Sequence, residues 1–186
     1  MDSLPDQIES DRLLLRRWRL ADRIPFAAMN ADPRVMEFFA GTLVASESDA
    51  LADRIQKHFD DRGFGLWAVE VKNGAPFIGF IGLMVPRFTA HFTPCVEIGW
   101  RLDANHWGQG YATEGARAAL DFAFINMGLD EVVSMTTVSN VRSRRVMEKL
   151  GMTHSPAEDF DHPLLPDGHP LGRHVLYRLQ RVPPSD

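Results

Sequence analysis

Hydrophobic and polar positions along the chain alternate every second residue in several segments, which is the period of a β-strand. Two of these segments flank the turn signal Asn73-Gly74 and predict a β-hairpin. We take the segment from 95 to 102 as the central strand, because it is apolar and leads into a glycine-bearing loop. The predicted strands are 9–19, 65–72, 77–84, 95–102, 132–138 and 174–180.

Other segments repeat their apolar residues every three or four positions, as an amphipathic helix does. Leu51, Ile55 and Phe59 form one such face. Asp32-Pro33 and Asn140 are typical helix starts, and glycines mark the expected ends. The predicted helices are 20–30, 32–38, 48–61 (ending near Gly63), 110–128 and 140–151.

The order of these elements predicts the fold class. Strands come both before and after the first helices, and 95–138 reads as strand, helix, strand, so the class is mixed α/β rather than doubly wound. The segment 155–172 holds four prolines and two glycines and is expected to be an irregular loop. The length of 186 residues suits a single domain over 1–186 with this Pro-rich loop inside it.

The composition limits the classes of partner and site that we expect. A formal charge of -5 argues against nucleic acid as a partner. No apolar run approaches about 18 residues, and the first residues lack a basic leader, so we expect no membrane contact and a cytoplasmic location by default. The single cysteine, Cys95, excludes an intramolecular disulfide and a multi-cysteine metal site.

The most informative chemistry lies between the central strand and the next helix. Glycines 108 and 110 let the backbone approach a ligand closely, and the amides of residues 108–113 lie at a helix N-terminus, which favours an anion such as a pyrophosphate. Tight packing alone also explains a glycine loop. Two rival phosphate motifs fail: there is no G-x-x-x-x-G-K-[ST], and Thr113 stands where a dinucleotide-binding loop has its third glycine.

Three ordered segments, EIGWRL, HWGQGYATEGARAAL and NVRSRRVMEKLGM, resemble the GNAT superfamily of acyl-CoA N-acyltransferases, and within it the RimJ/RimL-like group. The resemblance runs from about Ile8 to Arg181. It implies a mostly antiparallel, splayed sheet with flanking helices and direct transfer of an acetyl group from acetyl-CoA to a primary amine. The acceptor would be a small molecule or a protein N-terminus, and no metal is expected.

The resemblance also implies the residues that bind the co-substrate. The strand residues beside the pantetheine arm are Ile98, Gly99, Trp100 and Leu102, and those around the pyrophosphate are Trp107, Gly108, Gln109, Gly110, Tyr111, Ala112 and Thr113. Asn140 and Ser143 follow in the second helix. Trp107 departs from the family pattern [QR]-x-x-G-x-[GA], whose first position is polar.

Catalysis requires a base, because a lysine-like amine with a pKa of about 10.4 is mostly protonated at neutral pH. Glu97 on the central strand resembles the carboxylates that serve this role in the family; pairing with an arginine, or exposure to solvent, is the alternative. Many members use a tyrosine as the acid. Here Met147 occupies that position, the two tyrosines are Tyr111 and Tyr177, and Ser143 resembles the serine of RimL-like enzymes.

Several candidate residues also have a plain structural interpretation. Asn140 is a favoured N-cap, and Ser143 falls in the first turn of the same helix. The arginines at 142, 144 and 145 either reach the 3′-phosphate of CoA or form a solvated helix face. Cys95 is expected to be a small core residue rather than a nucleophile.

The Pro-rich loop gives two further hypotheses. Its neighbourhood holds several potential metal ligands, but their spacing matches no metal motif; they are His162, His169, His174, Asp161 and Asp167. We expect instead that this loop, Phe38, Phe39 and the segment before Trp67 shape the acceptor pocket. A catalytically idle CoA-binding or sensing module is the alternative function.

Overall fold

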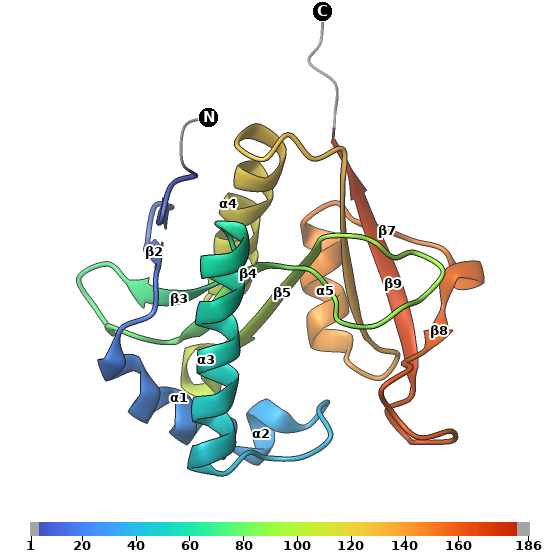
Figure 1. The fold of residues 1–186 in the computed structure, drawn as a ribbon, viewed down its shortest axis with the longest axis horizontal. Helices are drawn as coiled ribbons and strands as arrows, with labels where there is room; N and C mark the ends of the chain where they lie inside the picture. Colours follow the sequence, from blue (N-terminus) through green and yellow to red (C-terminus); the bar gives the residue numbers. More distant parts are fainter. Residues whose placement is uncertain (1–3, 182–186) are drawn as a thin grey trace, which may run out of the picture.

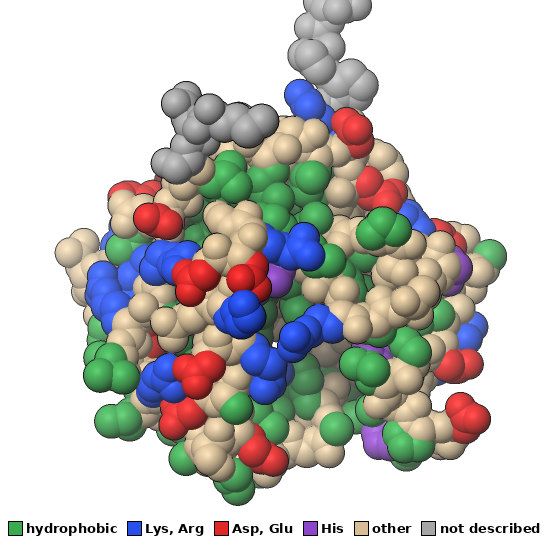
Figure 2. Space-filling model, in the orientation of Figure 1, with side chains coloured by type: hydrophobic (Ala, Val, Ile, Leu, Met, Phe, Trp, Pro, Cys, Tyr) green, Lys and Arg blue, Asp and Glu red, His purple; other side chains and the backbone are tan. Residues whose placement is uncertain are grey.

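The computed structural model describes residues 4–181 as an open β-sheet with helices on both faces (Figure 1, and as a space-filling view in Figure 2). The α-helices are α1 (Arg23–Asn30), α2 (Pro33–Met36), α3 (Ala45–Arg62), α4 (Tyr111–Ile125) and α5 (Val141–Lys149). Short 3₁₀ helices are η1 (Leu20–Asp22), η2 (Ala104–His106) and η3 (Pro156–Glu158). The strands are β1 (Ile8–Glu9), β2 (Leu13–Arg16), β3 (Leu66–Val71), β4 (Gly79–Met84), β5 (Glu97–Leu102), β6 (Glu131–Thr137), β7 (Thr153–His154), β8 (Phe160–Asp161) and β9 (Arg173–Gln180).

The sheet is mixed and mostly antiparallel, as the sequence predicts. Its strand order is β1-β2-β3-β4-β5-β6-β9-β7, and β8 pairs with β9. β5 and β6 pair in parallel, with α4 as the crossover between them, and the other pairs are antiparallel. The predicted α/β class is therefore confirmed.

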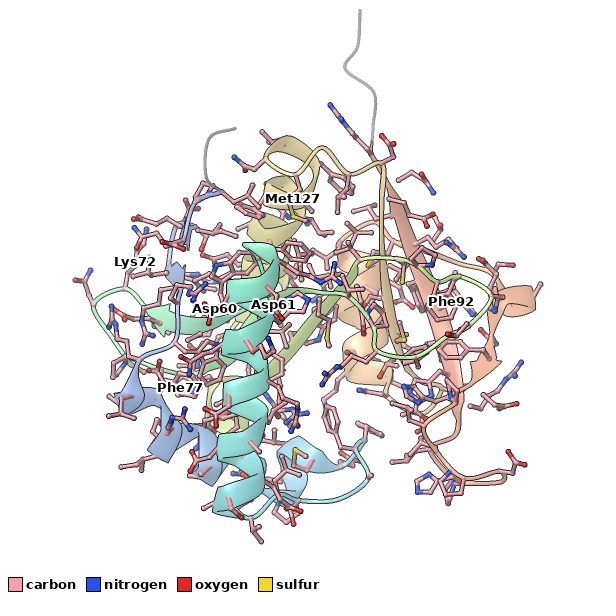
Figure 3. The ribbon with its side chains drawn as sticks, in the orientation of Figure 1. Asp60, Asp61, Lys72, Phe77, Phe92 and Met127 are labelled. Atoms are coloured by element: carbon pink, nitrogen blue, oxygen red, sulfur yellow. The ribbon has the colours of Figure 1, made fainter. Side chains whose placement is uncertain are left out.

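Side chains of β3–β5 point alternately to the two faces of the sheet, and helices cover both faces. One face packs against α1 through an aromatic cluster of Trp18, Phe26 and Phe77, the last of which is labelled in Figure 3. The other face packs against α4 so closely that a Cβ on Gly115 would lie 2.5 Å from the side chain of Ile81. The central strand β5 is thus fixed from both sides.

A second, smaller core lies beyond β6. It consists of Phe92, Val133, Phe160 and Leu176. Phe92 comes from the long β4–β5 loop and lies on the β9 side of the molecule (Figure 3). The loop and the C-terminal strands are therefore packed together rather than free.

The strand predicted at 9–19 is confirmed as β2 (Leu13–Arg16), but it is shorter than predicted and is preceded by a turn and a separate strand. The chain turns at residues 10–12, and β1 folds back antiparallel on β2, with Ile8 opposite Leu15. The turn is held by the Ser10 amide, which donates to the Leu13 carbonyl at 3.0 Å. Ser10 and Arg12 also bind Glu114 in α4, a contact that alternation along a sequence cannot show.

The remaining elements match the predictions with shifted ends. α2 ends at Met36 rather than Phe38, α3 starts three residues early at Ala45, and α4 ends at Ile125 rather than Gly128. The helix predicted to end near Gly63 does so, since this residue adopts a left-handed φ of 77°. The 155–172 segment is not wholly irregular, because it contains η3 and β8.

Candidate active site

The parallel pair β5–β6 comes together at one point and then separates. Its register contains the single pair Glu97 and Val133, where the Val133 amide donates to the Val96 carbonyl at 3.0 Å. Ser134 Oγ adds a bond to the Ile98 carbonyl at 2.9 Å. Beyond these contacts no ladder joins the described parts of the two strands, and we call the space between residues 99–102 and 135–137 the wedge.

Backbone groups of Trp100 face this wedge. Asp103 donates its amide to the Ile78 carbonyl on the β4 side, so the alternation of an antiparallel pair directs the N–H and C=O of Trp100 away from β4. An extended ligand with amide groups could therefore bind to β5 as an added strand would.

The loop after β5 presents further backbone donors. Gly108 and Gly110 have left-handed φ values of 75° and 84°, which a side chain would disfavour. Gly110 is the N-cap of α4, and no described side chain caps this helix end. The first-turn amides of Ala112 and Thr113 thus remain available, at the positive end of the helix dipole, for an anionic ligand.

Glu114 fixes the start of α4 to the N-terminal strands. Its carboxylate accepts bonds from Ser10 Oγ at 2.7 Å, the Arg12 amide at 2.8 Å and Arg12 Nε at 2.6 Å. The Arg12 guanidinium also lies over the ring of Tyr111, 4.8 Å from its centroid. The sequence pattern does not predict this anchor, because its partners are separated by about a hundred residues.

Trp107 connects the loop to the end of β5. Its indole Nε1 donates to the Leu102 carbonyl at 2.8 Å, and the Arg142 guanidinium lies 4.7 Å from its ring centroid. Arg142 also pairs with Glu37, across from α5 to the segment after α2. The departure from the family pattern therefore gives a packed aromatic residue that braces the loop.

Asn140 and Ser143 have the structural role that their positions suggested. Asn140 Oδ1 accepts from the Ser143 amide at 3.2 Å and caps α5, while its Nδ2 donates to Thr136 Oγ1 at 3.0 Å. Ser143 Oγ makes no hydrogen bond within residues 4–181. The two residues stand at the C-terminal side of the wedge, next to the end of β6.

Glu97 lies where β5 and β6 separate. Its carboxylate has no ion pair or hydrogen bond among the described residues, and burial raises its pKa to about 8. The alternative of an arginine partner is therefore not realised in the part of the chain described here. A carboxyl group of this pKa is well placed to accept a proton near neutral pH. Burial likewise raises the pKa of Cys95 to about 11, which keeps this thiol protonated.

No tyrosine replaces the missing acid near the wedge in the described chain. Met147 is 1% exposed and belongs to the core. The Tyr177 hydroxyl donates to Glu148 at 3.2 Å and accepts from Arg144 Nε at 3.4 Å, on the far side of β6. Of the basic cluster, Arg142 and Arg145 are exposed, as expected for a solvated helix face.

The histidines near the Pro-rich loop pack with aromatic rings. His162 and His174 lie 4.9 Å apart between ring centroids and contact Phe160. Burial lowers the pKa of both. Within residues 4–181, no three His, Cys, Asp or Glu side chains gather as metal ligands would.

A pocket of about 390 Å³ lies under the segment between α2 and α3. Phe39 lines this pocket. Phe38 does not, and its ring centroid lies 5.4 Å from the central guanidinium carbon of Arg142. Neither the Pro-rich loop nor the segment before Trp67 contributes to its lining among the described residues. The expected set of acceptor-pocket residues is thus brought together only in part.

A family model described as an acetyltransferase (GNAT) domain matches residues 12–153. The chain belongs to the GNAT acetyltransferases. It is 30% identical over 172 residues to the uncharacterized N-acetyltransferase YnaD of Bacillus subtilis, covering 92% of this chain and 95% of the relative. This GNAT chain is therefore an acyl-CoA-dependent acetyltransferase, from a family that uses acetyl-CoA as its co-substrate.

Solved structures agree with the fold of this GNAT acetyltransferase. An acetyltransferase from Agrobacterium tumefaciens str. C58 is 27% identical, with a TM-score of 0.75 and coverage of 97% of each chain. Mycobacterium smegmatis RimJ, solved in complex with CoA-disulfide, has a TM-score of 0.75 at 17% identity and covers 96% of this chain and 88% of its own. No described helix of the present protein is long and apolar enough to cross a bilayer.

Proposed function

We propose that the protein transfers an acetyl group from acetyl-CoA directly to a primary amine, with the CoA arm bound in the wedge. The observation that carries this proposal is the wedge itself, where the outward backbone groups of Trp100 adjoin an uncapped helix N-terminus. The pantetheine amides would pair with β5, and the pyrophosphate would bind the amides of residues 108–113. Asn140 and Ser143 would contact the arm from the other side.

In this proposal Glu97 takes the proton from the ammonium, directly or through water. The freed amine attacks the thioester carbonyl, and a backbone N–H of β5 stabilises the oxyanion. The C–S bond then breaks. The leaving thiolate has a pKa near that of cysteine, about 8.5, so it needs little help from an acid. The proton that it takes up is the one that the nitrogen loses as the amide forms, and Ser143 is our candidate to relay it.

The assignment to a group within the GNAT family rests on resemblance to known members. The segment NVRSRRVMEKLGM and the fold shared with RimJ support the RimJ/RimL-like group. We also propose one GNAT domain over 1–186, a cytoplasmic location, and an acceptor that is a small molecule or a protein N-terminus.

Release of free CoA thiol tests the function. The protein is incubated with acetyl-CoA and a panel of polyamines, aminoglycosides, amino acids and N-terminal peptides, and the acetylated amine is identified by mass spectrometry. We expect amine-dependent thiol release, with a reaction lacking amine as the control. Tight CoA binding without release for any amine would instead support the idle binding module.

The bond from Trp107 to β5 gives a prediction for co-substrate binding. Trp107→Phe keeps an aromatic ring but removes the donor to the Leu102 carbonyl. A hydrogen bond contributes about 1 kcal/mol, so we expect the KM for acetyl-CoA to rise about 5-fold and kcat to stay within about 2-fold. Steady-state kinetics with varied acetyl-CoA measure both.

A matched control removes the same kind of bond elsewhere. Trp18 Nε1 donates to the Leu66 carbonyl at 2.7 Å, outside the wedge. Trp18→Phe should lower stability without changing the KM for acetyl-CoA. Equal KM values for Trp107→Phe and the unmodified protein would remove Trp107 from the proposed site.

A further inference from the structure

Arg101 shares a face of β5 with Glu97. The two side chains are four positions apart on one strand, so their Cα atoms are about 13 Å apart. Gly99 lies between them, and a Cβ added there would meet no atom within 4 Å. The strand therefore presents a carboxylate, an open gap and a cation in a line, on the face that α1 and α2 also border.

This arginine is enclosed without an acidic partner. Its Nε atom is buried and makes no hydrogen bond, and Nη1 donates to Asn30 Oδ1 at 2.7 Å. Within residues 4–181 it forms no ion pair, and burial lowers its pKa to about 10, so it remains cationic at neutral pH. Burying a charge without a counter-charge costs several kcal/mol, a cost that is typical of a binding site and unusual for a purely structural residue.

Its neighbours hold the guanidinium in place. Asn30 is fully buried and donates from Nδ2 to Ser48 Oγ, also fully buried, at 2.9 Å. The guanidinium lies 4.0 Å from the ring centroid of Phe39 and 5.4 Å from that of Phe80. Cation–π contacts stabilise a cation but supply no hydrogen-bond acceptor, so the group stays incompletely paired.

Arg101 also lines the 390 Å³ pocket. Most of the lining is apolar or small, including Met36, Phe39 and Leu43. Glu47, the other charged residue in the lining, is exposed, and its carboxylate accepts the Val44 amide at 3.0 Å.

We propose that Arg101 binds a carboxylate of the acceptor, so that the enzyme prefers amines carrying a carboxylate several bonds from the nitrogen. The inference rests on the proposed function, because it places the reacting amine at Glu97. A single guanidinium matches one monoanionic carboxylate, whereas a phosphate dianion needs more donors than the pocket provides. The distance along β5 favours an ω-amino acid, a diamino acid reacting at its side chain, or a short peptide.

Matched acceptors test this preference. 6-Aminohexanoate and 6-aminohexanamide differ only in the charged group, and L-lysine and cadaverine differ only in the carboxylate. A charged hydrogen bond contributes about 1.5–3 kcal/mol, so kcat/KM should be about 30-fold higher for each carboxylate. In Arg101→Met the ratio should fall to about 1, while Arg101→Lys should retain part of it.

Two controls separate this role from a structural one. Arg23→Met removes an arginine of α1 that pairs with Asp49 and Asp53, and it should leave the ratio unchanged. Arg101→Met should melt at the same or a higher temperature, since it removes an unpaired buried charge. A lower melting temperature with an unchanged ratio would show a structural role and overturn the proposal.

A binding measurement keeps the inference independent of turnover. In the presence of CoA, 6-aminohexanoate should raise the melting temperature more than its amide does, and Arg101→Met should abolish the difference. Thiol release with neutral amines but equal ratios and equal melting shifts would overturn the carboxylate site and leave the acetyltransferase function standing. Absence of thiol release with every amine, together with an Arg101-dependent melting shift, would overturn the proposed acetyltransferase function and leave the carboxylate site standing.

Discussion

Glu97→Gln should lower kcat at pH 7.5 by about 100-fold, because general base catalysis contributes about 10²–10⁴-fold and water retains part of it. The activity of the unmodified enzyme should rise with pH and level off above about 8, the value to which burial raises the pKa of Glu97. The variant should lose this rise, since glutamine does not titrate. Rates from pH 6 to 9.5 at saturating acetyl-CoA measure both effects.

A matched substitution outside the site controls for the loss of charge. Glu9 pairs with Lys72 on the exposed edge of the sheet, and Glu9→Gln should leave the pH profile unchanged. An unaltered profile in Glu97→Gln would mean that another group, or the amine itself, sets the pH dependence. Glu97 would then lose its assignment as the base.

The same variant also reports the pKa through stability. The folded-state pKa of Glu97 is raised from 4.5 to about 8, so ionisation of Glu97 destabilises the folded protein as pH rises from about 4.5 to 8. Glu97→Gln lacks this loss, and its free energy of unfolding relative to the unmodified protein should improve by about 4 kcal/mol between pH 4.5 and 8.5. Urea denaturation at these two pH values measures the difference.

Asp22→Ala should lower the free energy of unfolding by about 3–5 kcal/mol, the largest stability change that we expect from one side chain. Asp22 and Arg16 are 2% and 4% exposed and share two hydrogen bonds of 2.8 and 2.9 Å. Asp22 also accepts the Arg19 amide at 2.7 Å. Its removal leaves a buried cation that Glu70 alone compensates at 2.8 Å.

An exposed pair of the same type provides the comparison. Asp60, labelled in Figure 3 on α3, contacts Arg17 at 2.5 Å with 66% of its side chain exposed. Asp60→Ala should cost less than about 1 kcal/mol, because solvent screens such a pair. Chemical denaturation of both variants measures the two changes in the free energy of unfolding. Equal decreases would show that burial does not set the contribution of Asp22.

The periodicity of the sequence predicted the order and type of most helices and strands, because it records which face of each element is buried. It missed the break at residues 10–12, where the chain turns to bring Ser10 and Arg12 to Glu114. Alternation of side chains continues through such a turn, so only the contact with a distant helix reveals it.

The backbone of the loop that we propose binds the co-substrate was similarly predictable, since glycines at 108 and 110 are a local requirement of its left-handed conformation. The surroundings of Arg101 could not be predicted from the sequence. Its partners Asn30 and Phe39 lie some seventy and sixty residues away in the sequence, and the absence of a carboxylate nearby is a property of packing alone. The raised pKa of Glu97 has the same origin.

The short register between β5 and β6 also has a mechanical consequence. The sheet is continuous in topology, yet the described register between β5 and β6 consists of the one pair Glu97 and Val133, so we expect the sheet to bend readily there. If one half of the sheet rotates slightly about this pair, atoms near the pair move little and atoms far from it move more. The proposed base would therefore stay almost still while the loop near Gly110, which we propose binds the pyrophosphate, moves furthest, so that the opening of the wedge can widen for a bulky nucleotide without disturbing the reacting groups.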